Sequence, residues 1–198
     1  MKILFSEASP DYAGYVFPYA VWAFLEAGER PADALARGFL PSLLDLSRFY
    51  LCRQVRVDLA RFRPSSENRR ILRKGEGIDC VLEERSAFEW TPERRAFCLG
   101  YATRRWSIAP NADRIDRIFH GALTTHVGVF RDPSGLEVGL VSLLRDRGTW
   151  FYSNAFYDAG HPIASLGAYL MTEIVRQLSE RGQELLHIGI YEHGQYRQ

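Results

Sequence analysis

Four polar residues gather around one break in the chain, and their side chains could move protons or stabilise negative charge: Asn154, Tyr157, Asp158 and Ser165. Residues 149–157 are rich in aromatic and small side chains, which predicts a strand, and helical spacing of apolar residues resumes after Ser165. A strand that leads into a helix through a short polar loop exposes the first backbone N–H groups of the helix. Such groups can hold an anion or a developing oxyanion. We therefore expect the chemistry of this protein at this junction.

Each residue near the junction has a catalytic and a structural interpretation. Tyr157 and Asp158 could orient an amine or relay its proton, with Asp158 the better base; alternatively, Tyr157 belongs to the sheet core and Asp158 forms a turn. Ser165 is expected to cap the helix and to leave the neighbouring N–H groups facing a substrate. Gly167 permits either close backbone approach or close helix–strand packing. His161 is a further candidate for the base.

A basic stretch in the first half of the chain predicts contact with a polyanion. Eight arginine and lysine residues lie between positions 53 and 74, where only Asp58 and Glu67 oppose them, whereas the whole chain carries a net charge of +1. A local basic patch on a nearly neutral protein suits a polyanion that is met in one orientation. The alternative is an ordinary solvated helix face.

The composition is that of a globular protein, with 198 residues, 46% hydrophobic and 25% charged. Cys52, Cys80 and Cys98 are odd in number and widely spaced, which argues against a disulfide framework and against a metal knuckle. The histidines have no zinc spacing, and those inside apparent strands, His126 and His187, are expected to be core residues. With no bilayer-spanning apolar run and no signal-peptide pattern, we expect a reducing, cytoplasmic location.

The pattern of apolar residues and turns predicts a mixed α/β fold. Expected strands are 15–25, 49–59, 78–84, 124–130, 136–144, 150–157 and 185–190, and expected helices are 31–37, 65–74, 91–106, 110–119 and 165–181. The last five elements are three antiparallel strands, a helix and a strand, so the third strand begins a strand–helix–strand crossover, which should be right-handed with parallel strands. This order resembles the GNAT-like acyltransferase fold. We expect one domain over residues 1–198, with residues 1–48 as an aromatic N-terminal segment packed on it.

Two ordered blocks of sequence carry a resemblance to a known family. The first block contains Cys52-Arg53, Arg56-Val57, Phe62-Arg63-Pro64-Ser65 and Arg69-Arg70-Ile71-Leu72. The second contains Phe156-Tyr157-Asp158, Ser165-Leu166-Gly167-Ala168-Tyr169-Leu170, His187-Ile188-Gly189 and Tyr196-Arg197. Together they resemble the arginyl-tRNA–protein transferases and their bacterial relatives, the aspartate–glutamate leucyltransferases. The C-x-x-C motif of that family is absent, so the resemblance is to a short, divergent member.

The resemblance implies an aminoacyltransferase that moves an amino acid, arginine or leucine, from charged tRNA to the N-terminal amine of a protein or peptide. The tRNA ester is already activated, and an α-amine with a pKa near ~8 is partly neutral at physiological pH. The reaction therefore needs positioning, a mild base or proton relay, and oxyanion donors, but no covalent nucleophile. Aminoacyl-tRNA is the co-substrate, and neither a further cofactor nor a metal is expected.

The residues expected to perform this reaction fall into three groups. The expected catalytic residues are Tyr157, Asp158 and Ser165. The expected substrate-binding residues are Asn154, Gly167, Tyr169, His161 and Tyr196. The candidates for tRNA phosphates, or for the acceptor's N-terminal carboxylate, are Arg53, Arg56, Arg69, Arg70, Arg73 and Lys74.

Two alternatives remain open at the level of sequence. The first is an acyl-CoA-dependent N-acyltransferase of the GNAT type. Such enzymes carry an R/Q-x-x-G-x-G/A loop around the CoA pyrophosphate, whereas residues 164–169 here lack both the Arg/Gln and the second small residue, which disfavours CoA. The second is a non-catalytic relative that binds RNA or protein through the arginine patch.

Overall fold

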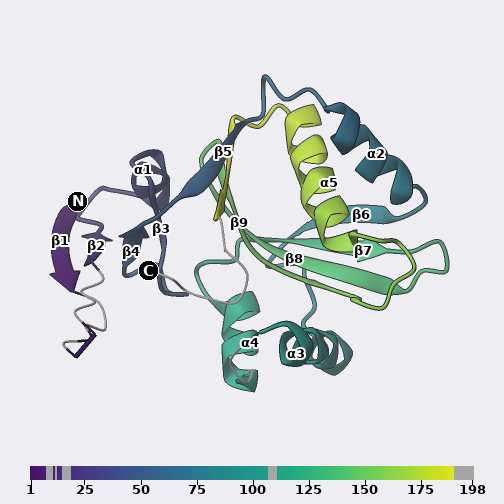
Figure 1. The fold of residues 1–198 in the computed structure, drawn as a ribbon, viewed down its shortest axis with the longest axis horizontal. Coiled ribbons are helices and arrows are strands. Elements are labelled where there is room, and N and C mark those ends of the chain that lie inside the picture. The colour runs from purple at the N-terminus through teal and green to yellow at the C-terminus, as the bar shows by residue number, and fades with distance from the viewer. Residues whose placement is uncertain (8–10, 12, 15–18, 107–110, 190–198) are drawn as a thin grey trace.

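The computed structural model describes residues 1–7, 11, 13–14, 19–106 and 111–189. These residues form two β-sheets, and helices cover both faces of the larger sheet (Figure 1). The larger sheet has the strand order β5-β10-β9-β8-β7-β6. Its strands are β5 (Gln54–Asp58), β6 (Asp79–Glu84), β7 (His126–Arg131), β8 (Glu137–Asp146), β9 (Thr149–Tyr157) and β10 (Leu185–Gly189).

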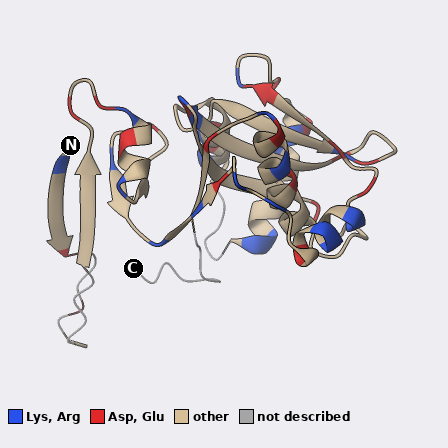
Figure 2. Cartoon of the chain, turned by 90° about the horizontal axis from the view of Figure 1, so that it is seen from above, with Lys and Arg blue, Asp and Glu red and all other residues tan. Residues whose placement is uncertain are grey.

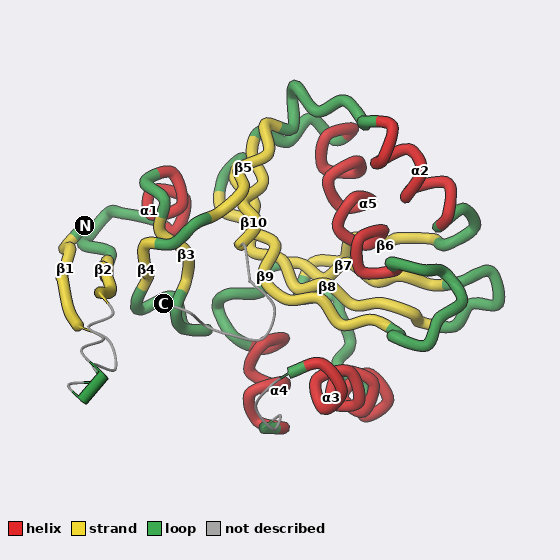
Figure 3. Tube along the Cα trace, in the orientation of Figure 1, coloured by secondary structure: helices red, strands yellow, loops and turns green. Residues whose placement is uncertain are grey.

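The helices lie in two layers on either side of this sheet (Figure 3). One face carries α2 (Ser66–Lys74) and α5 (Leu166–Glu180), and the other carries α3 (Pro92–Arg105) and α4 (Ala112–His120). Side-chain caps start α2 and α3, since the Ser65 hydroxyl accepts from the N–H of Asn68 at 3.1 Å and the Thr91 hydroxyl accepts from the N–H of Arg94 at 3.3 Å. The expected helices 65–74 and 91–106 therefore begin where the sequence predicts.

The order of strands confirms the predicted fold class. Strands β7, β8 and β9 are successively antiparallel, and α5 connects β9 to β10, which pairs parallel to it. The fold is therefore a mixed α/β fold of the GNAT type.

Alternating side chains give the larger sheet a core on each face. Trp150 and Leu186 pack with Leu170 and Ile174 of α5 on one face. On the other, a second cluster that includes Phe156 packs against α3 and α4. Burying a side chain such as Leu170, which is 0% exposed, contributes roughly 2 kcal/mol, so α5 is held firmly on the sheet.

The two parallel strands of the larger sheet, β9 and β10, are paired over only part of the length of β9 among the described residues. Within the described part of the chain, β10 pairs with β9 only from Thr149 to Tyr152, although β9 continues to Tyr157. At the same point the β8–β9 register shifts, because Ser142 pairs with Asn154 and Leu143 pairs with Tyr152. Residue 153 is thus an extra residue, a β-bulge, and such bulges bend a strand and re-aim its side chains. Among the described residues, the end of β9 pairs with β8 alone, and we call it the open end of β9.

The smaller sheet has the order β1-β2-β4-β3 and lies beside the β5 end of the larger one (Figure 1). Its strands are β1 (Lys2–Glu7), β2 (Tyr19–Phe24), β3 (Phe39–Pro41) and β4 (Phe49–Leu51), with α1 (Pro31–Ala36) between β2 and β3. Asp146 of β8, only 4% exposed, ties this region to the larger sheet. Its carboxylate accepts from Arg30 Nε at 2.7 Å and from the N–H of Ala32 at 3.0 Å.

One predicted strand is wrong in a way that matters for the site. The expected single strand 49–59 is two strands, β4 and β5, which belong to different sheets and are separated by Cys52 and Arg53. Alternating apolar residues identify extended backbone but not its pairing partner, so the pattern cannot reveal a change of sheet. Of the expected strand 15–25, residues 19–24 form β2, and residues 15–18 lie outside the described ranges.

Candidate active site

The N-terminus of α5 presents backbone N–H groups at the open end of β9. The helix begins at Leu166, and the carbonyl of Ser165 accepts from the N–H groups of Ala168 at 2.9 Å and Tyr169 at 3.1 Å. Among the described residues, the N–H groups of Leu166 and Gly167 have no acceptor. These two donors are available to an anion or oxyanion, as a helix N-terminus allows.

Ser165 occupies the predicted N-cap position but does not cap with its side chain. Its backbone lies in the left-handed region, with φ 70° and ψ 37°, and its hydroxyl makes no capping hydrogen bond. The usual capping geometry needs an extended N-cap residue, from which the side-chain oxygen reaches back to the helix. The expectation of a side-chain cap is therefore wrong, and its consequence is that the exposed hydroxyl and the first N–H groups are both unengaged.

Tyr157 lies directly over this first turn. A Cβ placed on Gly167 would be 2.7 Å from Cε1 of Tyr157 and 3.1 Å from its hydroxyl oxygen, so only glycine leaves room for the ring. The close-packing interpretation of Gly167 is confirmed, and its partner is the phenol ring of Tyr157. The packing brings a hydroxyl within reach of the helix N-terminus.

Tyr101, on α3, is a second phenol at the site that the sequence analysis missed. Its ring centroid is 4.8 Å from that of Tyr157. Burial raises the pKa of Tyr101 well above its usual value, and the neighbouring phenol of Tyr157 raises it further. A lone tyrosine inside a helix 56 positions away has no spacing relation to β9, so no local pattern could have found it.

Tyr152 adds a third phenol on the α5 side of the open strand pair. The residue is 9% exposed and packs in the α5 core. Burial raises its pKa above the usual range, and the neighbouring phenols Tyr101 and Tyr157 add to that shift. Tyr101, Tyr152 and Tyr157 therefore share one region, and burial keeps the phenols of Tyr101 and Tyr152 in their neutral form.

Asp158 and His161 make their contacts inside the connecting loop. A carboxylate oxygen of Asp158 accepts from the N–H of Gly160 at 2.8 Å, and His161 Nδ1 accepts from the N–H of Ile163 at 3.3 Å. The first contact is the Asx-type turn that the structural interpretation of Asp158 predicted. A role for either side chain as the base stays a prediction.

Asn154 lies at the bulge, on the face opposite to α5. Its backbone N–H donates to the Ser142 hydroxyl at 3.1 Å, and its Nδ2 donates to the Ser153 hydroxyl at 2.8 Å. Ser142 alternates with Val141 and Leu143, which belong to the α5 core, so Ser142 and its partner Asn154 point to the α3–α4 face. The structure does not bring the Asn154 side chain to the same face as Ser165.

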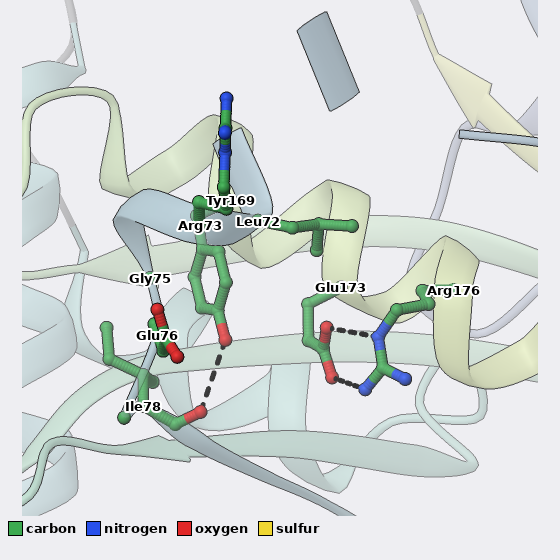
Figure 4. A pocket seen from close by; sticks show the side chains of 9 residues that line it. Leu72, Arg73, Gly75, Glu76, Ile78, Tyr169, Glu173 and Arg176 are labelled. Carbon is green, nitrogen blue, oxygen red and sulfur yellow. Dashed lines mark hydrogen bonds and ion pairs between the residues drawn. The ribbon is translucent and has the colours of Figure 1, made fainter. Parts of the chain in front are cut away.

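Tyr169 is a packing residue. It is 4% exposed, its hydroxyl donates to the carbonyl of Ile78 at 3.2 Å, and its ring fills the space beside Gly75 (Figure 4). The other tyrosine expected in the substrate site, Tyr196, lies outside the described residues.

The basic residues are divided between two regions. In α2, Arg69 donates to the carbonyl of Pro64 at 2.6 Å, and Arg70 is paired with Glu67. Arg73 and Lys74, at the end of the same helix, are exposed and have no acidic partner within the described ranges. Since the following Gly75 contacts Tyr169 in the first turn of α5, these two cations lie near that turn.

Arg56 and Arg53 are not part of that group. Arg56 pairs in register with His187, whereas the neighbouring pair of Val57 and Leu186 faces the α5 core. By strand alternation Arg56 points to the opposite face of the sheet. Arg53 lies in the link between the two sheets. The structure therefore joins the α2 cations to the α5 face but not the strand arginines.

A hollow of about 330 Å³ between the end of α2 and α5 is not a separate anion site. Glu173 at its wall is 6% exposed and forms two contacts of 2.6 and 2.8 Å with Arg176, which also pairs with Glu180. The charge of Arg176 is thus compensated. Figure 4 shows Arg73 at the rim, pointing away from this pair.

Other groups capable of chemistry are engaged in the fold. Burial raises the pKa of the thiols of Cys80 and Cys98, which keeps them protonated and unreactive. His187, 1% exposed, contacts Gln54 Oε1 through Nδ1 at 2.7 Å, which confirms that it is a core residue. No cluster of three or more metal-binding side chains exists among the described residues. Nor is any helix in those ranges long and apolar enough to cross a bilayer.

Comparison with known proteins supports the fold and leaves the family open. No protein family model and no curated protein sequence matches the chain. L-PGS from Bacillus licheniformis matches with a TM-score of 0.55 at 15% identity, covering 83% of this chain and 52% of that one. The C-terminal domain assigned to a lysylphosphatidylglycerol synthetase from Agrobacterium fabrum matches with 0.54 at 17% identity, with the same coverage.

FemX matches with a TM-score of 0.53 at 8% identity, covering 84% of this chain and 60% of that chain. This chain thus spans about half the length of the two matched synthetase structures. At these identities the likeness shows a shared fold. The specific resemblance to arginyl-tRNA–protein transferases stays a prediction.

Proposed function

We propose that this protein is an aminoacyltransferase that moves an amino acid from charged tRNA to an amine, the N-terminal amine of a protein or peptide. The observation that carries the proposal is the Tyr157 hydroxyl placed over the unengaged N–H groups of Leu166 and Gly167 at the open end of β9. The fold likeness adds support, since lysylphosphatidylglycerol, named in the description of one matched structure, is an aminoacylated product.

The site matches what aminolysis of an ester requires. The carbonyl oxygen of the aminoacyl ester would lie at the N–H groups of Leu166 and Gly167, which stabilise the oxyanion of the tetrahedral intermediate. A neutral amine attacks an activated ester without a covalent nucleophile, so the reaction does not call on Cys80 or Cys98, whose pKa values burial raises. Tyr157 is then the group placed to handle protons.

The charges near α5 suit a carrier that is a polyanion. Arg73 and Lys74 are exposed, unpaired within the described ranges, and close to the first turn of α5. Phosphates of a tRNA acceptor end bound there would place the 3′ aminoacyl group toward the helix N-terminus. Arginine or leucine is the amino acid that we propose, from the sequence resemblance.

An amine fits the site better than a hydroxyl acceptor such as the glycerol of phosphatidylglycerol. A hydroxyl must lose its proton to attack, which calls for a well-placed base. The two candidate bases of the loop, Asp158 and His161, each already accept one backbone N–H within the loop. A partly neutral α-amine needs no such base.

A donor-competition experiment tests the proposal. The protein is incubated with labelled arginyl-tRNA, leucyl-tRNA or acetyl-CoA, together with peptides that differ in the first residue or with phosphatidylglycerol vesicles. We expect label to move from charged tRNA to the peptide amine. Label that moves only from CoA would establish the acyl-CoA alternative, label on the lipid would reassign the acceptor, and no transfer would leave a binding module.

A further inference from the structure

We propose that the end of α3 and the start of α4 bind the unpaired 3′-terminal nucleotides of the carrier RNA. The surface that binds them consists of Tyr101, Arg105, Trp106 and Arg114, and we call it the α3–α4 surface. The inference rests on the proposed function and deepens it, because it gives the carrier a second contact on the other side of the sheet. None of these four residues belongs to the sequence blocks that suggested the function.

Two aromatic side chains place this surface against the end of β9. The ring centroid of Tyr101 is 4.8 Å from that of Tyr157 and 5.8 Å from that of Phe156. Trp106, which follows the last turn of α3, has its ring centroid 6.0 Å from that of Phe156. Both rings are partly exposed, whereas Phe156 beneath them is 0% exposed. The α3–α4 surface therefore adjoins Tyr157 from the side of the sheet opposite to α5.

Arg105 lies on the sheet-facing side of α3 and is nevertheless exposed. It follows Tyr101 by four residues and Ala102 by three, and residues at these spacings share one face of a helix. Ala102 is 0% exposed, because the helix rests on the sheet at that point. Arg105, one turn later, is exposed and has no acidic partner in the described part of the chain. The helix has therefore passed beyond the sheet here, and this cation lies beside the open end of β9.

Arg114 brings a second cation to the same place from α4, which lies beside α3 on this face (Figure 3). Its guanidinium carbon is 5.4 Å from the Trp106 ring centroid. Residues 101–114 contain three arginines and one acid, Asp113, and the next acid along α4, Asp116, is already ion-paired at 2.8 Å with an arginine of α3. Arg114 itself is exposed and pairs with no acid within the described ranges. The α3–α4 surface is therefore positively charged.

An aromatic ring beside two unpaired cations is the combination that binds single-stranded nucleic acid. Bases stack on exposed rings, and arginines contact the phosphates that flank them. A duplex keeps its bases paired and would use the cations alone. The amino acid of a charged tRNA is esterified to the last ribose of an unpaired 3′ end. Because the terminal base is attached to that same ribose, it must lie next to the reacting ester, and thus next to this surface.

The carrier RNA then contacts the two sides of the sheet with different parts. The cations at the end of α2 contact phosphates of the acceptor stem, and the ester lies at the first N–H groups of α5. The terminal base continues past Tyr157 and stacks on Trp106. Arg114 is held by the Trp106 ring and by no acid among the described residues, so it can turn from the ring to a phosphate when the base stacks there.

The test measures, by filter binding, the affinity for uncharged tRNA and for the same tRNA trimmed of its unpaired 3′ nucleotides. Wild type is compared with Arg105→Gln combined with Arg114→Gln, with Trp106→Leu, and with Trp106→Phe, which keeps a ring. The matched control is Arg145→Gln with Arg181→Gln, two exposed arginines at the other end of the sheet, where β9 begins and α5 ends. Thermal unfolding verifies the fold of every variant.

We expect the double arginine variant and Trp106→Leu each to bind full-length tRNA about tenfold more weakly, and the trimmed tRNA as wild type does. Trp106→Phe should recover most of the loss. The arginine variant should also reduce the slope of log K against log salt by about 1.4, because each phosphate contact on a single strand contributes about 0.7. Trp106→Leu should leave that slope unchanged, since a stacked ring releases no counterion. Arg73→Ala with Lys74→Ala should by contrast weaken the binding of both RNAs.

The outcomes separate this inference from the function on which it rests. A loss in both variants that is confined to full-length tRNA, and absent in the matched control, establishes the α3–α4 surface. If either variant binds both RNAs as wild type does, or loses the same factor with both, the inference is overturned, while transfer from charged tRNA by wild type still upholds the function. Weakened binding of an acidic peptide alone would assign the surface to the acceptor and overturn the inference. If wild type binds no tRNA, both are overturned.

Discussion

At the scale of single residues, the candidate site is defined by side chains that are distant in sequence and contact one another in the fold. Tyr157 and Gly167 are adjacent in space because one ring needs the volume that a glycine leaves. Tyr101 approaches them from α3, with its ring centroid 4.8 Å from that of Tyr157, a contact that no sequence spacing encodes. The chemistry that we propose depends on the contact between Tyr157 and Gly167.

His187 gives a residue-scale prediction for the dependence of stability on pH. Burial, followed by the nearby charge of Arg56, lowers its pKa to about 4, while Nδ1 contacts Gln54. The folded state therefore binds this proton less readily than the unfolded state, whose pKa is near ~6.5. The neutral His187 imidazole contributes fully to the free energy of unfolding above pH ~6.5. This contribution is lost as the pH falls toward 4, by about 3 kcal/mol in total.

The measurement is urea unfolding of wild type and His187→Gln between pH 7.5 and 4.5. We expect the wild type to lose more stability over this range than the variant, which has no imidazole to protonate. Equal losses in the two proteins would show that His187 protonates as easily in the folded state as in the unfolded one.

At the scale of elements, the packing of α5 on β9 should depend on the absence of a side chain at position 167. Gly167→Ala places a methyl group 2.7 Å from the Tyr157 ring, and such overpacking costs about 1–3 kcal/mol. In a Tyr157→Ala background the clash is removed, and the higher helix propensity of alanine should make the same change stabilising by up to about 1 kcal/mol.

Thermal or denaturant unfolding of the four proteins measures this coupling directly. A change of sign between the two backgrounds is the expected result. If Gly167→Ala has the same effect with and without the ring, Tyr157 does not rest on the first turn of α5 in solution, and the site geometry fails with it.

Most elements could be predicted from the sequence because their signals are local. The Ser65 and Thr91 caps and the aromatic and small side chains of residues 149–157 lie within the elements whose boundaries they mark. Three features could not be predicted from the sequence. The break at residues 52–53 depends on pairing partners, the three-residue strand β3 is too short for a period, and Tyr101 meets Tyr157 only through tertiary packing.

The position of the candidate site could be predicted from the sequence, but the roles of several of its side chains could not. The junction of β9 with α5 was located correctly, because a strand, a polar loop and a helix follow one another in sequence. The roles of individual side chains were harder to predict, since they depend on backbone geometry. Ser165 adopts a left-handed conformation in place of a capping one, and the bulge turns Asn154 toward the other face.

At the scale of the whole molecule, positive and negative side chains are interspersed along the chain (Figure 2), so only local groups of cations can define a polyanion site. Arg73 and Lys74 form one such group, close to the first turn of α5. Each cation that contacts a phosphate contributes about one unit to the slope of log K against log salt.

Replacing both residues, Arg73→Ala with Lys74→Ala, should weaken tRNA binding and reduce that slope by about two, as measured by filter binding at several salt concentrations. The matched control is Arg85→Ala with Arg117→Ala, which removes two cations from the side of the sheet that carries α4. An unchanged slope in the first variant, or an equal reduction in both variants, would show that the end of α2 does not contact the tRNA.

The measurement that tests the central claim most directly is single-turnover transfer of a labelled amino acid from charged tRNA to a peptide N-terminus, in wild type and in Tyr157→Phe. The account predicts transfer by wild type and a loss of about a hundredfold in the variant, with tRNA binding unchanged. Transfer at the wild-type rate in Tyr157→Phe would contradict it, because the reaction would then take place without the hydroxyl at the junction of β9 and α5.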